Sequence, residues 1–418
     1  MLTVFHTADW HLGQSFFGFD RDYEHTRFFE WLLGQLESQR PDALIVAGDV
    51  FDSINPSATA QRRYYDFLAK AGRSVPGLQI VITAGNHDAG ARLEAPSHLL
   101  NSLNITVIGT VSRNERGEID LEKFLIPLKD VAGNTSAIVM AIPFLRPSDV
   151  PALSTAADPY LDGIRELYRQ VTLAACEFRS QHCPDAALVA MGHCHLLGGE
   201  ESRDSERRVV VGGAEGLAVD VFAEEIAYVA LGHLHRSQEF REGRVRYCGS
   251  GIPLSFAESF HEHQIVRLQF EGQRLILADR IKVPRSVAMV RVPAREAALI
   301  DDVLPLLEQL PADDSLAPDE FAFLEVRLLE DRPDPTRRHR IEQAIEGKPF
   351  RLSSIKVEYP GRSAECPAND LSREIADLHS ISEEEVFLNA HRERYGTEAD
   401  DSLRKAFREI LLQESHGG

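Results

Sequence analysis

Histidine, aspartate and asparagine side chains follow five short apolar stretches that lie far apart in the chain. Each stretch has the length and composition of a buried strand and stops abruptly at these polar residues. In an open α/β sheet, ligands gather at the carboxyl ends of the strands, so the five endings can meet in one site. The residues that could ligate a metal there are Asp9, His11, Asp49, Asn86, His193, His233 and His235.

This mixture of imidazole, carboxylate and amide ligands is typical of a site for two divalent ions. Two ions about 3.5–4 Å apart share one bridging carboxylate and hold a water that can attack a phosphate ester. Mixed nitrogen and oxygen ligation suits Mn²⁺ or Fe²⁺. A structural zinc site would need thiolates, and the five cysteines form no CxxC pair. The residues therefore predict a two-metal phosphodiesterase.

Each motif taken alone also has a purely structural interpretation. The GNHD string at 85–88 could be a polar turn. Asp9 and His11 could form a buried hydrogen-bonded pair. The GHLH string at 232–235 could end a core strand. Their joint occurrence favours the metal site, because one site accounts for all five segments. One alternative stays open, because the GHCH string at 192–195 also offers His195 in competition with His193.

The elements that must position these residues can be predicted from apolar periodicity and from glycine and proline positions. We expect strands at 2–7, 43–47, 80–84, 105–109, 137–143, 187–191, 226–231 and 265–270, with a helix at 23–39. A second unit should contain strands at 287–292, 321–329 and 350–359 and helices at 294–310 and 335–345. Two helices should follow, because the SEEE string at 382–385 has capping-box spacing and an apolar stripe runs from Leu403 to Leu411.

Composition narrows the classes of protein. The chain has 418 residues and a net charge of -20, which excludes a broad basic surface that grips DNA unaided. Five cysteines, an odd number in a long chain, disfavour a disulfide framework. We expect no signal peptide and no membrane span, since no apolar run approaches ~20 residues. These features predict a cytoplasmic protein.

Longer strings of residues resemble a known family. HTADWHLG at 6–13, GDVFD at 48–52, GNHD at 85–88 and GHLH at 232–235 resemble the calcineurin-like metallophosphoesterase signature. YCGS at 247–250, followed by PLSF at 253–256, is similar to the SbcD family of nuclease subunits. This resemblance implies an α/β fold, a four-layer α/β/β/α metallophosphoesterase sandwich over 1–280. It also implies a small α+β capping domain at 285–360 and a helical partner-binding segment at 370–415.

The resemblance also implies roles for individual residues. One metal would be held by Asp9, His11, Asp49 and His235, and the other by Asp49, Asn86, His193 and His233, with Asp49 as the bridge. His87 would be the catalytic histidine, which stabilises the transition state or protonates the leaving 3′ oxygen. Asp88 would orient His87 through its far ring nitrogen. The family pattern favours His193 over His195 and leaves the role of Asp52 open.

For function, the resemblance implies Mn²⁺-dependent hydrolysis of DNA phosphodiesters. The expected activities are 3′-to-5′ exonuclease action on duplex ends and endonuclease cutting of single strands or hairpins, in DNA repair, recombination and replication at the nucleoid. The helices at 370–415 would bind SbcC, an SMC-like ATPase, and the protein would form a homodimer. Two rival hypotheses are a phosphoesterase acting on small phosphodiesters or phosphoproteins, and a non-catalytic scaffold for DNA ends.

Overall fold

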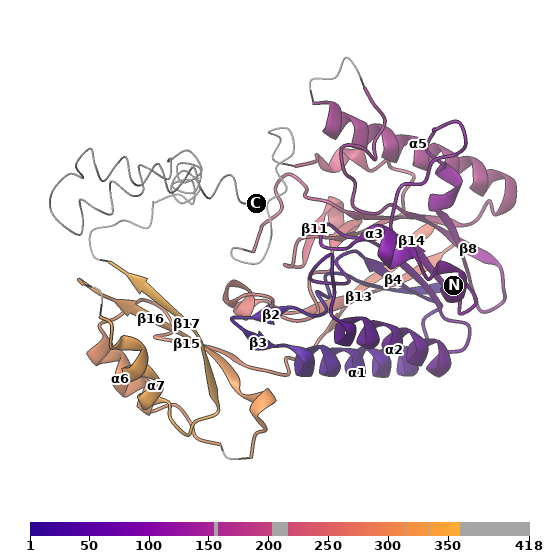
Figure 1. The fold of residues 1–418 in the computed structure, drawn as a ribbon. Coiled ribbons are helices and arrows are strands. Elements are labelled where there is room, and N and C mark those ends of the chain that lie inside the picture. Colours follow the sequence, from indigo (N-terminus) through magenta and orange to yellow (C-terminus); the bar gives the residue numbers. More distant parts are fainter. Residues whose placement is uncertain (154–157, 203–215, 314, 333, 360–418) are drawn as a thin grey trace, which may run out of the picture.

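The computed structural model of the chain describes residues 1–153, 158–202, 216–313, 315–332 and 334–359 (Figure 1). The helices expected at 370–415 lie outside these residues. Two bodies are visible, a large one built on two six-stranded sheets and a small one built on three strands. None of the helices in the described ranges has the length and apolar character needed to cross a membrane.

The first large sheet combines parallel and antiparallel strands. Its order is β14 (Arg274–Lys282), β13 (Gln264–Glu271), β1 (Leu2–Thr7), β4 (Ala43–Ala47), β5 (Gln79–Thr83) and β6 (Ile105–Ile108). Strands β1, β4, β5 and β6 are parallel, and β13 and β14 are antiparallel additions at one edge. Helices α1 (Asp22–Gln39) and α2 (Ala58–Ser74) cover its outer face, where the rings of Phe29 and Phe67 stack 4.4 Å apart.

The second large sheet has β9 and β10 at its centre. Its order is β11 (Gln238–Phe240), β12 (Val245–Tyr247), β10 (Tyr228–Gly232), β9 (Ala187–His193), β8 (Thr135–Ala141) and β7 (Leu125–Lys129). The long helix α5 (Pro159–His182) packs on its outer face. Asp158 caps that helix by accepting hydrogen bonds from the backbone N–H groups of Tyr160 and Leu161.

The inner faces of the two sheets share one apolar core. Val4 and Ile45 from the first sheet pack in the same buried cluster as Val139 and Val189 from the second. This arrangement, with helices outside both sheets, confirms the predicted α/β/β/α sandwich (Figure 1). Parallel strands β1, β4 and β5 in one sheet and β9 and β10 in the other deliver their carboxyl ends to the proposed ligands.

The small body is a β-α-β-α-β unit. Strands β15 (Met289–Val292), β16 (Ala322–Leu329) and β17 (Phe350–Glu358) are parallel in that order. Helices α6 (Ile300–Glu308) and α7 (Arg337–Ala344) pack on one face. We call this body the cap.

The helix predicted at 294–310 begins later than expected, at Ile300. Residues before it pair with β16 instead, since the N–H of Leu329 donates to the oxygen of Ala298 at 2.8 Å. Alanine-rich sequence favours a helix, but here the sheet contact overrides that local preference.

Short elements complete the fold. They are β2 (Ser15–Phe16), β3 (Phe19–Asp20), α3 (Gly90–Glu94), α4 (Ser97–Asn101), η1 (Leu121–Phe124), η2 (Val219–Val221), η3 (Arg241–Gly243), η4 (Phe256–Phe260) and η5 (Pro318–Glu320). The β2–β3 hairpin and η4 contact the cap. Phe16 and Phe256 pack with Phe323 of β16, so Phe16 is a packing residue.

Candidate metal centre

The backbone turns sharply where strands end at the site. Asp9, His11, Asp49 and His233 all have positive φ angles of 53°, 46°, 49° and 101°. Residues other than glycine seldom adopt this conformation, and such strain concentrates at functional sites. Gly85 lies beside them for a steric reason, because a Cβ atom there would lie 2.1 Å from Oδ1 of Asp49.

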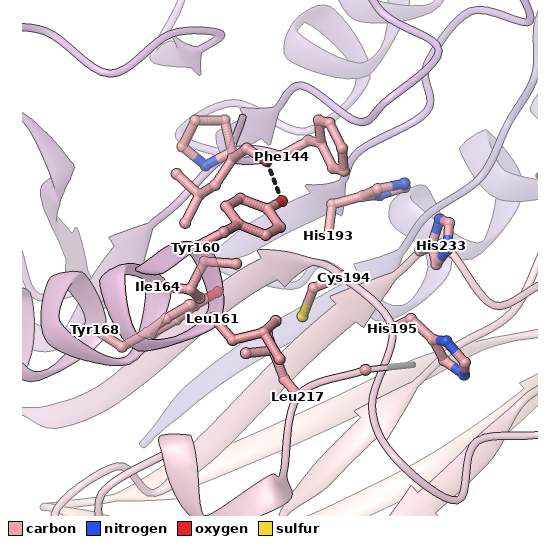
Figure 2. Close-up of a pocket in the computed structure, with 13 residues that line it drawn as sticks. Phe144, Tyr160, Leu161, Ile164, Tyr168, His193, Cys194, His195, Leu217 and His233 are labelled. Atoms are coloured by element: carbon pink, nitrogen blue, oxygen red, sulfur yellow. Dashed lines mark hydrogen bonds between the residues drawn. The ribbon is translucent and has the colours of Figure 1, made fainter. Parts of the chain in front are cut away.

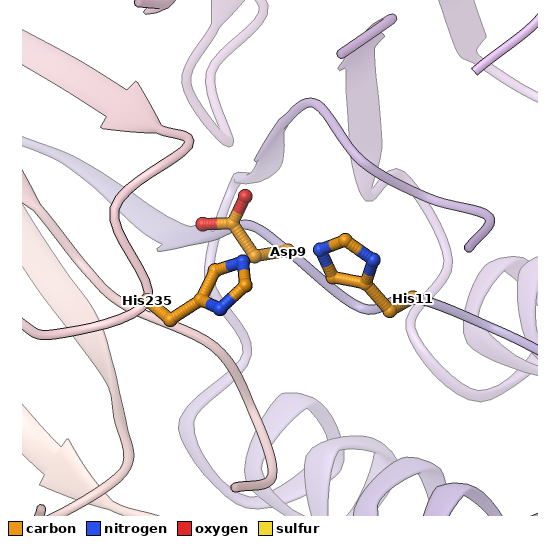
Figure 3. A group of neighbouring side chains, drawn as sticks. All are labelled: Asp9, His11 and His235. Carbon is orange, nitrogen blue, oxygen red and sulfur yellow. The ribbon is translucent and has the colours of Figure 1, made fainter. Parts of the chain in front are cut away.

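Asp9, His11 and His235 form the first group of converging side chains (Figure 3). All three are buried, and their ligand atoms lie within 4.8 Å of one another. Oδ1 of Asp9 accepts a hydrogen bond from the backbone N–H of His233 at 2.9 Å. Oδ2 of Asp9 and Nε2 of His11 are buried and lack a hydrogen-bond partner among the described residues. Two buried lone-pair donors left in this state are what a shared cation would satisfy.

The second group contains His193, Asn86 and His233. Nε2 of His193 lies 2.9 Å from Oδ1 of Asn86, and Nδ1 of His233 lies 3.2 Å from the same oxygen. Asp49 lies between the two groups. Its Oδ2 is 3.5 Å from Nε2 of His11 and 3.3 Å from Nε2 of His193. The structure thus brings all seven predicted ligands together, with Asp49 in the central position.

Acceptors outside the centre hold the other ring nitrogens of three histidines. Nδ1 of His11 lies 3.2 Å from the Asp52 carboxylate, and Nδ1 of His235 lies 3.1 Å from Glu258. Nδ1 of His193 donates to the backbone oxygen of Ala47 at 2.9 Å. A hydrogen bond on Nδ1 places the proton there, which leaves Nε2 as a lone-pair donor for a metal.

Two of these outer residues are not assigned by the sequence. The family pattern leaves the role of Asp52 open, and Glu258 belongs to none of the motifs that mark the proposed ligands. Glu258 comes just after the PLSF string at 253–256, and that proximity is the only sequence signal pointing to it.

His87 lies beside the first group, with its ring 4.8 Å from that of His11 in an edge-on arrangement. Its ring atom Nδ1 lies 2.8 Å from the backbone oxygen of Asp52. The backbone N–H of His87 donates to Oδ1 of Asp49 at 2.9 Å. The predicted contact with the His87 ring is not among the hydrogen bonds that the structure gives the Asp88 carboxylate. Asp88 accepts instead from the backbone N–H groups of Gly85, Phe51 and Val50, at 2.8, 2.9 and 3.1 Å. Its carboxylate therefore organises the loops beneath the ligands.

His195 lies at the edge of the second group, with its ring 6.4 Å from that of His233. Its Nδ1 is 3.6 Å from Glu201, and its side chain is 24% exposed. The His193 side chain, in contrast, is 0% exposed and directed at Asn86 and Asp49. The geometry favours His193 as the ligand, in agreement with the family pattern.

Burial and charge at the centre oppose each other. Burial raises the pKa of Asp9 to about 7 and lowers that of His233 well below its usual range. Burial alone would lower the pKa of His193 and raise that of Asp49. Their mutual attraction outweighs it, so the pKa of His193 rises to about 9 and that of Asp49 falls. A proton held on His193 beside an ionised Asp49 supplies the positive charge that a divalent cation would bring.

A small pocket of about 50 Å³ adjoins the second group (Figure 2). His193 and His233 form one side, and α5 contributes Leu161 and Ile164. The Tyr160 hydroxyl, also on α5, donates to the backbone oxygen of Leu145 at 2.7 Å. The wall is mostly apolar, so an organic group attached to a phosphate held at the centre would meet apolar side chains there.

The donor set, the central carboxylate and the orphaned atoms together fit divalent metal ions. Comparison with known proteins agrees. Residues 2–237 match the family model described as calcineurin-like phosphoesterase, and residues 285–395 match one described as type 5 capsule protein repressor C-terminal domain. The chain is therefore a calcineurin-like phosphoesterase, a class of metal-dependent hydrolase.

Relatives narrow the class further. The chain is 41% identical over 375 residues to the SbcD component of the SbcCD nuclease from Rhodobacter capsulatus, a match that covers 89% of this chain and 92% of the relative. It is 29% identical over 426 residues to the SbcD protein of Escherichia coli K12, covering 99% and 98% of the two chains. The Bacillus subtilis SbcD protein is 34% identical over 262 residues, 62% of this chain and 63% of the relative. The chain belongs to the SbcD family of nuclease subunits.

Proposed function

We propose that this protein is the Mn²⁺-dependent nuclease subunit of an SbcCD complex, cutting DNA phosphodiesters. It would act as a 3′-to-5′ exonuclease on duplex ends and as an endonuclease on single strands and hairpins, at the nucleoid. The observation that carries the proposal is the position of Asp49 between two ligand groups, with His87 beside them. Residues 1–280 would form the nuclease domain and 285–360 the capping domain.

The residues divide the work as follows. Asp9, His11, Asp49 and His235 hold one ion, and Asp49, Asn86, His193 and His233 hold the other. The bound ions supply Lewis acidity and an activated water. Because Nδ1 of His87 faces the Asp52 oxygen, Nε2 is the atom that exchanges a proton with the leaving 3′ oxygen.

The apolar pocket supports a nucleotide substrate over a bare phosphate. A nucleoside that enters beside Leu161 would keep its phosphate at His193 and His233. In enzymes generally, the binding of a substrate group that does not react helps to orient the bond that does.

Partner binding follows from the family and from the acidic composition. The family model that matches the cap continues to residue 395, past the described residues and into the helices predicted at 370–415. We assign those helices to contact with the SbcC ATPase. With a net charge of -20, the protein would draw much of its grip on DNA from that partner.

For the homodimer we propose the helices that follow the first two ligand motifs, together with the surface after the third. Ile54, Tyr65, Leu99 and Leu103 are 56%, 37%, 74% and 50% exposed there. Sedimentation of Leu99→Glu should give monomers, and Leu173→Glu should stay dimeric because Leu173 lies on α5, at 56% exposure. Dimers that persist in Leu99→Glu and in a Tyr65→Glu, Leu99→Glu double variant would exclude this surface.

The decisive experiment compares duplex DNA with a small phosphodiester, each with and without the ATPase partner. We expect Mn²⁺-dependent release of mononucleotides from duplex ends. The partner and ATP should increase the rate of this release. Turnover of the small ester alone in both conditions would instead support the alternative, a small-molecule or phosphoprotein phosphoesterase.

A further inference from the structure

Glu258 is a buried carboxylate that neither the proposed ligand set nor the proposed chemistry uses. It is 0% exposed and lies on the short helix η4. One oxygen lies 3.1 Å from Nδ1 of His235, and the other accepts from the backbone N–H of Leu254 at 2.8 Å and from the Ser250 hydroxyl at 3.4 Å. Glu258 therefore ties His235, a member of the group in Figure 3, to the segment 250–258.

The same segment is held from the other side by a buried arginine. Arg21 is 1% exposed, and its Nη1 donates to the backbone oxygen of Pro253 at 2.6 Å. It also donates to Gln14 at 2.9 Å, and the Gln14 amide donates to the oxygen of Leu254 at 3.2 Å. Arg21 and Gln14 thus fix the two residues whose backbone lies next to the Glu258 carboxylate.

The cap packs directly on these groups. Phe323 of β16, fully buried, lies 4.9 Å from the Phe16 ring and 5.4 Å from the Arg21 guanidinium carbon. Phe16 in turn lies 5.3 Å from Phe256 at the start of η4. We call Phe16, Phe256, Val287 and Phe323 the cap contact cluster.

Further contacts place the cap against the two segments that connect to the first ligand group, the β2–β3 hairpin and η4. Arg291 of β15 lies 5.9 Å from the Phe256 ring and 5.5 Å from the Phe260 ring, at the two ends of η4. On the hairpin side, Tyr23 donates to Glu320 of the cap at 2.7 Å. The cap therefore touches the hairpin that follows Asp9 and His11 and the helix that carries Glu258.

We propose that Glu258 is a positioning residue for His235, and that packing of the cap on the contact cluster sets how tightly the ion at Asp9, His11 and His235 is held. This rests on the metal ligands of the proposed function. A carboxylate on the outer nitrogen of a ligating histidine fixes the ring and raises its basicity, and its loss costs roughly 10–100-fold in metal affinity. A partner or a DNA end that displaces the cap would release Glu258 and weaken one ion without touching a ligand.

The test is a titration of the metal-free full chain with Mn²⁺. Calorimetry measures the number and affinity of the bound ions, and electron paramagnetic resonance measures their spectrum. We expect two bound ions in the unmodified protein, with the spectrum of a coupled pair. Glu258→Leu should weaken one ion by about 10–100-fold and remove the coupled spectrum, and the other ion should bind normally. Glu258→Gln keeps one acceptor oxygen and should lose less. This variant carries the test if the leucine variant does not fold.

The coupling to the cap has a matched pair of variants on one strand. Phe323→Ala removes the β16 ring from the contact cluster and should weaken the same ion several-fold. Val326→Ala lies on the opposite face of β16, packed toward α6 and α7, and should leave both affinities unchanged. Unchanged affinities in both Glu258 variants would overturn the positioning role, and equal effects of Phe323→Ala and Val326→Ala would overturn the coupling. An unmodified chain that binds fewer than two ions would instead refute the metal centre itself.

Discussion

Nδ1 of His87 lies 2.8 Å from the backbone oxygen of Asp52, and the carboxylate of the same Asp52 lies 3.2 Å from Nδ1 of His11. One residue thus orients the proposed catalytic histidine with its main chain and a proposed ligand with its side chain. The two functions can be separated by mutation, because a side-chain change leaves the main-chain oxygen in place.

Asp52→Asn should weaken metal binding more than chemistry. An amide is a poorer acceptor than a carboxylate for the His11 N–H, so the Mn²⁺ dissociation constant should rise by about tenfold. At saturating Mn²⁺ the turnover number should return close to that of the unmodified protein. Nuclease assays across a Mn²⁺ series measure both quantities, and a low turnover number that excess Mn²⁺ fails to restore would contradict this division.

His87→Ala should show the opposite pattern. Removal of a proton-transfer group typically lowers turnover by about 10²–10⁴-fold. Mn²⁺ affinity should be unchanged, since His87 is outside the proposed ligand set. Single-turnover cleavage of duplex DNA and Mn²⁺ calorimetry check the two halves, and an unaltered cleavage rate would remove His87 from the chemistry.

Asp88→Asn should affect stability more than the pH dependence of cleavage. Its carboxylate accepts three backbone N–H bonds, and an amide group offers one acceptor oxygen and places an N–H₂ among donors. Leaving such buried donors unpaired costs about 1–3 kcal/mol each. Denaturant unfolding measures the loss. A changed pH profile of cleavage with unchanged stability would restore the orienting role first expected for Asp88.

The difference between Asp88 and Asp52 shows where sequence reasoning succeeds and where it fails. The strand ends could be predicted because each of the five apolar runs stops within two residues of a glycine or a polar ligand, and this pattern is visible in the sequence. The hydrogen-bond partner of the His87 ring could not be predicted, because this partner is a backbone oxygen and every residue has one. Adjacency of His87 and Asp88 suggested a contact, but the Asp88 carboxylate is directed at backbone N–H groups below the site.

The same limit applies to longer-range partners. Glu258 lies 23 residues from His235 in the chain and meets it only through the packing of η4. The start of α6 was predicted six residues early because alanine and glutamate favour a helix, whereas the pairing of Ala298 with β16 is a tertiary contact. Local pattern predicted the strand ends that carry the ligands, and tertiary packing determined what holds them in place.

Stability of the metal-free protein should fall as the pH rises toward 9. The pKa of Asp9 is raised to about 7 and that of His193 to about 9, so both groups bind protons more tightly in the folded chain than in the unfolded chain. The protonated form of each group contributes fully to stability below the pKa of the unfolded chain, which is 3.8 for Asp9 and 6.5 for His193. That contribution is lost as the pH rises through the pKa of the folded chain.

Bound Mn²⁺ should reverse this trend, because a cation replaces the proton on His193 and favours ionised Asp9. The gain in melting temperature on adding Mn²⁺ should therefore increase between pH 6.5 and about 9. Thermal unfolding with chelator or with Mn²⁺ across this range measures it. His193→Gln should flatten the dependence, and a gain that is constant with pH would show that no proton is displaced.

Filling the pocket in Figure 2 should separate nucleotide binding from metal binding. Leu161 lines the pocket from α5, and Leu161→Trp would occupy the space assigned to the nucleoside. We expect kcat/KM for duplex DNA to fall by about tenfold or more, a loss of roughly 1.4 kcal/mol in transition-state stabilisation, with Mn²⁺ affinity unchanged. Leu173→Trp, on the same helix at an exposed position, is the matched control and should cleave normally. Equal rates for the two variants would place the nucleoside elsewhere, because a pocket that holds substrate must respond to a side chain built into it.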